Sequence, residues 1–232
     1  MSVNEKMKAI ADAIRDKTGK TEEMTLDQMA TEIAGIETGG GSEELIEVLA
    51  SQSLTEYSNE KITNVKAPLF YWQYGLQKVS LPNCTTLSSM TFYGCDKLVE
   101  VNIPKLMCCE NNVFRNCSSL TEIVFPNHSG RVDQSAFEGC TKLQKADFAE
   151  INRDQGISGY GFGNCKALTS LIIRSQTVVA KLAVTSGLTG TPIANGTGYI
   201  YVPSALLEEY KTATNWSVYA EQFRTIEGSE YE

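Results

Sequence analysis

The sequence predicts an α+β repeat fold: a solenoid of parallel strands with a helical module before it and a helical cap after it. Three features support this prediction, namely a motif that recurs through the middle of the chain, an amphipathic N-terminal segment and an aromatic-rich C-terminal segment. We therefore expect four parts: a helical module at 1–36, a Gly-rich linker at 37–42, the solenoid at 43–203 and the cap at 204–232.

The recurring motif is F-x-[GN]-C-x-x-L-x-x-h-x-h, where h is an apolar residue and x is any residue. A degenerate copy begins at Phe70, with Gln73 in place of the cysteine, and 200–203 repeats the strand-and-proline ending. The stretch 175–198 is less regular and predicts either an insertion or a loosened last turn. The four regular copies, separated by 22, 23 and 25 residues, begin at Phe92, Phe114, Phe137 and Phe162.

Units of this length are too small to bury their own apolar face, and stacking them builds one continuous core. The alternation h-x-h has the period of a strand, so the units are expected to align their strands in a parallel sheet. At about 4.8 Å between strands, five to six turns give a stack of roughly 25 Å. The Phe-Cys half of each unit is the return side, where Gly or Asn suits a left-handed backbone.

These repeats resemble the BspA-type leucine-rich repeat over about residues 66–203. The resemblance implies the solenoid fold directly. It is weak for function, because repeat scaffolds serve many partners. Similar repeats occur in bacterial surface proteins, which leaves a cell-surface or secreted adhesion module as an alternative function.

The N-terminal segment 1–36 is of a different kind. Apolar residues from Val3 to Ile14 recur every three or four positions, which predicts a helix, and a capping box at 25–28 starts a second one. The two apolar seams either pack on each other, or on copies of themselves in a homo-oligomer or on a larger assembly. The sequence leaves these alternatives open.

Residues 1–36 resemble a segment that begins tail and other structural proteins of phages and prophages of Gram-positive bacteria. The resemblance implies a non-enzymatic, tail-associated structural protein located in the virion or in a prophage-derived particle. Residues 1–36 would then contact other tail proteins, and the solenoid would present a surface to a host-cell glycan or protein. The segment also lacks the apolar core of a secretory signal, which disfavours direct export.

Composition excludes several classes of function. The net charge of −8 disfavours nucleic-acid binding through a basic field, and no apolar stretch approaches the about 20 residues of a membrane span. His128 is the single histidine, and its position after Pro126 predicts an exposed loop residue rather than a catalytic base. We expect no catalytic residues, no cofactor and no metal site.

Seven cysteines are present, and four of them share one column of the repeat. Stacked turns would arrange this column as a ladder of small buried groups that stay reduced, because parallel side chains do not favour disulfides. Cys108 and Cys109 interrupt the column, and no second cysteine pair completes a zinc site with them. The ladder consists of Cys95, Cys117, Cys140 and Cys165.

Two surfaces are candidates for binding. The outward strand positions mix both charge signs without an aromatic stripe, as in a plain solvated sheet face; they run through Lys78, Glu100, Glu122, Lys145 and Ser170 and, in the next column, Ser80, Asn102, Val124, Asp147 and Ile172. The denser aromatic group Tyr71, Trp72 and Tyr74 either covers the first turn or forms a patch that binds sugar or protein.

Overall fold

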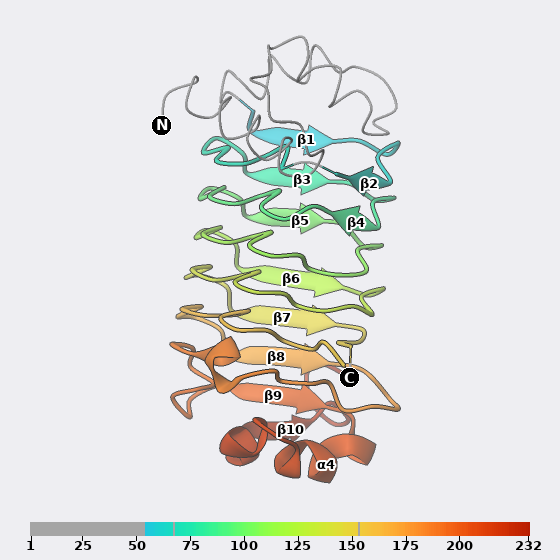
Figure 1. Ribbon diagram of the computed structural model, residues 1–232, viewed down its shortest axis with the longest axis vertical. Coiled ribbons are helices and arrows are strands. Elements are labelled where there is room, and N and C mark those ends of the chain that lie inside the picture. Colours follow the sequence, from blue (N-terminus) through green and yellow to red (C-terminus); the bar gives the residue numbers. More distant parts are fainter. Residues whose placement is uncertain (1–53, 67, 153) are drawn as a thin grey trace, which may run out of the picture.

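The computed structural model describes residues 54–232 except 67 and 153. Within this part, short parallel strands lie above one another in a single stack, with the C-terminal helix at its lower end (Figure 1). The expected helical module at 1–36 and the linker at 37–42 lie outside the described residues.

Each turn contributes a strand of two to four residues. The helical elements are η1 (Thr185–Leu188), η2 (Ser204–Leu206), α4 (Leu207–Thr212) and η3 (Ser217–Gln222). The strands are β1 (Glu56–Ser58), β2 (Asn64–Val65), β3 (Lys78–Ser80), β4 (Thr86–Leu87), β5 (Glu100–Asn102), β6 (Glu122–Phe125), β7 (Lys145–Phe148), β8 (Ser170–Ile173), β9 (Tyr199–Val202) and β10 (Phe223–Thr225).

The strands form three sheets among the described residues, with the orders β1-β3-β5, β10-β9-β8-β7-β6 and β2-β4. Every named pair is parallel. The register joins residues one repeat apart, as in Val79 opposite Val101 and Ile123 opposite Ala146. The predicted solenoid of parallel strands is therefore confirmed.

The phenylalanines of the motif form a continuous ladder through the core. Their rings are stacked at centroid distances of 5.0–5.3 Å, with interplanar angles of 5–8°. A backbone hydrogen bond fixes each step, because Phe92 N–H donates to Val113 O at 2.8 Å and Phe114 N–H donates to Ala136 O at 2.8 Å. Turn spacing thus sets ring spacing. The ladder runs through Phe70, Phe92, Phe114, Phe137 and Phe162, all fully buried.

The Gly/Asn position of the motif has the left-handed backbone that the sequence predicts, with φ between +56° and +77° from Trp72 to Gly190. A second left-handed position, two residues before each phenylalanine, was not predicted. Side chains other than glycine occupy it, and the repeat pattern held no Gly or Asn signal for it. These residues are Met90, Asn112, Ser135 and Tyr160, with φ between +56° and +62°.

The irregular stretch 175–198 forms a turn, so the loosened-turn alternative is correct. Phe162 N–H donates to Gly187 O at 2.8 Å, as Phe137 N–H donates to Gly161 O in the turn before. Leu188 follows Phe162 in the ladder, and the fully buried Thr191 follows Cys165. The backbone path persists although the motif residues are replaced.

The C-terminal segment is less helical than expected. Its α-helix, α4, has six residues, and β10 adds a final parallel strand to β9. Large side chains join the segment to the last turn: Trp216 Nε1 donates to Ala180 O at 2.6 Å, and Ala180 N–H donates to the Tyr210 hydroxyl at 2.9 Å. Tyr210 and Trp216 are both fully buried.

The expectation of an exposed His128 is wrong. His128 is 1% exposed, and its Nδ1 lies 2.6 Å from Glu150 O. It follows Cys84 and Leu106 at steps of 22 residues, in a core column that continues to Ile151. The apolar repeat therefore carries an imidazole into the interior at this turn.

Shortening one ring of the ladder should be costly. We expect Phe114→Ala to lower the free energy of unfolding by about 3–5 kcal/mol, because a buried ring is lost and a cavity remains. Phe114→Leu should cost less than about 1.5 kcal/mol, since Leu188 already fills the equivalent position. Urea unfolding measures both values. Equal losses for the two variants would contradict this expectation, because they would show that an aliphatic side chain cannot replace the ring.

His128 should make stability depend on pH. Burial lowers its pKa below the ordinary value, so the unfolded chain takes up the proton first as the pH falls. Stability is fully present above the unfolded value of about 6.5 and is lost as the pH falls toward the folded-state pKa. We expect the urea midpoint of His128→Leu to change less between about pH 7 and 5.5 than that of the parent protein. Identical slopes in the variant and the parent would contradict this.

Candidate functional site

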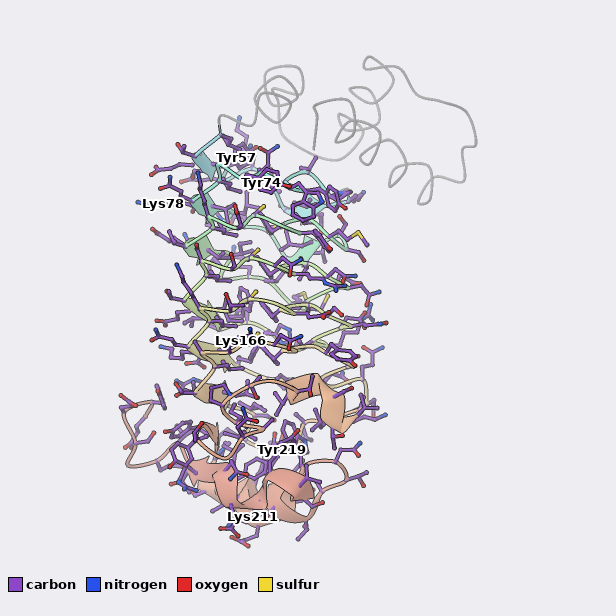
Figure 2. The ribbon with its side chains drawn as sticks, turned by 90° about the vertical axis from the view of Figure 1, so that its left-hand side faces the viewer. Tyr57, Tyr74, Lys78, Lys166, Lys211 and Tyr219 are labelled. Atoms are coloured by element: carbon purple, nitrogen blue, oxygen red, sulfur yellow. The ribbon has the colours of Figure 1, made fainter. Side chains whose placement is uncertain are left out.

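The outer strand face carries a column of acidic and basic side chains from β1 to β7. Lys78 Nζ lies 3.6 Å from Glu56 Oε1 and 3.7 Å from Glu100 Oε2. In the next two turns of the same column, Lys145 Nζ lies 2.6 Å from Glu122 Oε1. Figure 2 shows Lys78 projecting from the strand side of the stack. The side chains of Glu56, Lys78 and Glu100 are 49–65% exposed, so this half of the face is a solvated surface, as predicted, and its ion pairs contribute little stability.

The same face changes character over the last turns, where the prediction of a plain solvated surface is wrong. Ser170, Asp147 and Ile172 are at most 7% exposed. Arg174 covers Asp147 with two hydrogen bonds of 2.8 and 2.9 Å, and the Tyr231 hydroxyl lies 2.9 Å from Ser170 Oγ. The C-terminus returns to the level of β8 (Figure 1), which repeat spacing alone does not indicate.

A hollow of about 360 Å³ lies between β9, β10 and this returning tail. Register places Tyr199 opposite Ser170 and Tyr201 opposite Ile172, so both rings extend the outward columns. Arg224 lies over the Tyr199 ring at 4.3 Å. Sequence reasoning missed this aromatic group because the outward columns were followed only to β8. The lining residues are Tyr199, Tyr201, Arg224, Thr225, Glu227, Gly228 and Ser229.

The sequence-predicted patch is assembled at the corner of the first turns. Tyr71 and Tyr74 each lie within 6.0 Å, centroid to centroid, of the Trp72 ring. Tyr93 completes the group at 5.1 Å from Trp72 and 5.3 Å from Tyr71. Tyr93 follows Tyr71 by one repeat of 22 residues, a signal that could have identified it. We call Tyr71, Trp72, Tyr74 and Tyr93 the aromatic corner; Figure 2 shows Tyr74 beside the first turns.

Local backbone chemistry holds the corner in place. Trp72 has φ +56°, and its indole lies against Gly94, where a Cβ atom would come within 2.1 Å of the ring. The absence of a side chain at Gly94 is therefore necessary for this ring position. Arg115 lies over the Tyr93 ring at 5.9 Å and pairs with Glu138 at 3.3 Å.

The indole of Trp72 contains an unsatisfied donor beneath the surface of the corner. Its Nε1 atom is buried and has no hydrogen-bond partner among the residues that the structure describes. All four rings of the corner remain half-buried rather than covered. The group therefore offers apolar ring surface, hydroxyl groups and a flanking guanidinium in one place.

The cysteine column forms a ladder of thiol–carbonyl contacts. Each sulfur lies close to the carbonyl oxygen of the phenylalanine one turn earlier: Cys95 Sγ to Phe70 O at 2.9 Å and Cys117 Sγ to Phe92 O at 3.1 Å. Cys140 and Cys165 repeat this contact at 3.1 Å. Burial raises the pKa of Cys117 and Cys165 well above the ordinary value, so these two thiols stay protonated. The arrangement is suited to structure rather than to nucleophilic chemistry.

The cysteines outside the ladder also have local explanations. Cys109 occupies a second apolar column on the return side, bridged in parallel to Val132 and onward to Ile157 and Leu182. Cys108 lies at 3.6 Å from Glu110 Oε1. Burial and this carboxylate raise its pKa to about 11. All seven cysteines are free.

The described part of the chain contains neither a metal-binding cluster nor a membrane-spanning helix. No group of three or more His, Cys, Asp or Glu side chains there is arranged to hold a metal ion. No helix in residues 54–232, without 67 and 153, is long and apolar enough to cross a bilayer.

Comparison with known proteins identifies the type of repeat. The model of the BspA type leucine rich repeat region matches residues 63–183 in six copies. A leucine-rich repeat protein from Eubacterium ventriosum is 21% identical, with a TM-score of 0.44, over 59% of this chain and 43% of its own. One from Bacteroides ovatus is 13% identical, with a TM-score of 0.37, over 66% of this chain and 52% of its own.

The chain thus spans about half the length of these two solved structures. No curated protein matches it. The family model covers more than half of the 232 residues and coincides with the stacked turns seen in the structure. The chain belongs to the family of BspA-type leucine-rich repeat proteins.

Proposed function

We propose that this protein is a non-enzymatic binding module that presents its aromatic corner to a glycan or protein on a bacterial surface. The observation that supports this most is the group of four rings at one end of the stack, three from one turn and one from the next. Tyrosine and tryptophan provide large contact areas at a low cost in side-chain entropy.

The chemistry of the corner fits a surface ligand. Flat rings stack on the apolar face of a sugar or pack against a protein side chain, and tyrosine hydroxyls can exchange hydrogen bonds with either kind of ligand. Arg115 and Glu138 border the rings with one charge of each sign. The stacked turns hold these groups rigidly, which reduces the entropy lost on binding.

The N-terminal segment 1–36 suggests a more specific role, as part of a phage or prophage tail. Its resemblance to the start of phage and prophage tail proteins suggests attachment to other tail proteins, in the virion or a prophage-derived particle. Homo-oligomerisation through the same segment would multiply the weak contacts of each corner. At the other end, the segment 204–232 would act as the cap, since Tyr210 and Trp216 cover the last turn.

A second candidate is an adhesion module on the bacterial cell surface or outside the cell. Membership of the BspA-type family supports it, because this repeat type resembles that of bacterial surface proteins. Both candidates require a binding surface. They differ in whether the solenoid belongs to a phage-like particle or to the bacterial cell surface and its surroundings.

Removing rings from the corner should weaken binding. We expect Tyr71→Ala and Tyr93→Ala each to reduce retention on purified Gram-positive cell walls by about tenfold, as for aromatic anchors in other interfaces. The measurement is cosedimentation of the purified protein with the walls.

Tyr160→Ala is the matched control, because Tyr160 is 45% exposed and lies outside the corner. Its retention should equal that of the parent protein. If the corner variants were retained as well as the control, the corner would not be the binding surface.

Attachment to particles is tested by fractionation. We expect mass spectrometry of an induced source strain to find the chain enriched in gradient-purified phage-like particles, and a chain lacking 1–36 to be lost from them. Enrichment in the cell envelope instead would reject the tail proposal and favour the adhesion module.

A further inference from the structure

The hollow at the end of the sheet face is a second region with binding chemistry, remote in sequence from the aromatic corner. It brings together β9, β10 and the tail that follows β10. It is an open surface depression of about 360 Å³, so a ligand would lie against its rings rather than be enclosed.

Arg224 is held in a fixed position within this hollow. Its Nη1 donates to the carbonyl oxygens of Glu221 at 2.9 Å and Phe223 at 2.7 Å. Its guanidinium also lies over the Tyr199 ring at 4.3 Å. Among the described residues, no acceptor is bound to its Nε or Nη2, which leaves one edge of the guanidinium available. That edge has two parallel donors, the geometry that matches a carboxylate.

Two tyrosines supply the surface for the rest of a ligand. Tyr199 is 37% exposed, and its ring meets that of Tyr201 at 75° and 6.4 Å. Tyr231 packs against Tyr201 at 4.6 Å and is anchored to Ser170, so the tail forms a wall. No described residue is hydrogen-bonded to the hydroxyl of Tyr199 or Tyr201. These groups can stack on a pyranose ring and exchange hydrogen bonds with its hydroxyls.

Glu227 supplies a negative charge to the hollow, in addition to the positive charge of Arg224. Hydrogen bonds from backbone N–H groups, its own and that of Ser204, lower its pKa, so the carboxylate is ionised at neutral pH. An ionised carboxylate accepts several hydrogen bonds and suits the hydroxyl groups of a sugar. It also repels a second carboxylate, which directs the acidic group of a ligand toward Arg224 instead.

We propose that this hollow binds an acidic saccharide unit of the uronic-acid class, with its carboxylate on the free edge of Arg224 and its ring against Tyr199 and Tyr201. Glu227 accepts hydrogen bonds from the sugar hydroxyls on the other side. A neutral sugar makes no ion pair with the exposed guanidinium of Arg224, and a simple carboxylate makes no contact with either ring, so neither matches the whole site.

The test uses saturation-transfer NMR on the full chain with methyl glucuronide, methyl glucoside and acetate as probes. We expect methyl glucuronide to bind with a dissociation constant on the order of millimolar and the other two to bind about tenfold more weakly. Arg224→Gln should weaken the glucuronide by about tenfold and leave the glucoside unchanged. Tyr199→Ala should weaken both sugars.

Two further variants keep the test decisive. Arg224→Lys retains the charge but loses the paired donors, so it should weaken the glucuronide even if Arg224→Gln does not fold. Tyr160→Ala removes a similarly exposed tyrosine elsewhere and should change nothing. Equal binding of glucuronide and glucoside, equal binding by the parent and Arg224→Lys, or no binding at about 10 mM would each overturn the proposal.

Discussion

The rest of the structure depends on one constraint: each residue lies directly beside its counterpart one turn away. Hydrogen bonds between turns, such as Phe92 N–H to Val113 O at 2.8 Å, hold this register at every step. A column in the sequence therefore becomes a physical stack of like groups. The phenylalanine rings at 5.0–5.3 Å and the thiols beneath the carbonyls are two results of the same alignment.

The columns also explain how a repeat protein acquires local sites. A substitution in one turn is placed beside its neighbours in the turns above and below, so a few exchanges create a cluster. Tyr93 beside Tyr71 is one such cluster, and Arg115 extends it by a further turn. At the other end, Tyr201 and Arg224 lie side by side for the same reason. The scaffold stays constant while its outward residues change.

Much of the fold and part of the candidate site could be predicted from periodicity. The motif predicted the parallel strands, and three of the four rings of the aromatic corner adjoin one another in the chain. His128 was misplaced because its loop was judged by local sequence, whereas its column with Cys84 and Leu106 places it in the core. The hollow at β9 and β10 was missed because the tail that forms its wall carries no repeat.

The sequence by itself determined the architecture, because apolar residues at a fixed spacing can bury their faces only by stacking turn on turn. It also determined which residues share a column. The tertiary structure alone decided where the columns end and what covers them. The tail placed Tyr231 on Ser170, and the final strand placed Arg224 on Tyr199. Contacts of this kind join segments outside the repeat, and their geometry follows from packing in three dimensions rather than from spacing along the chain.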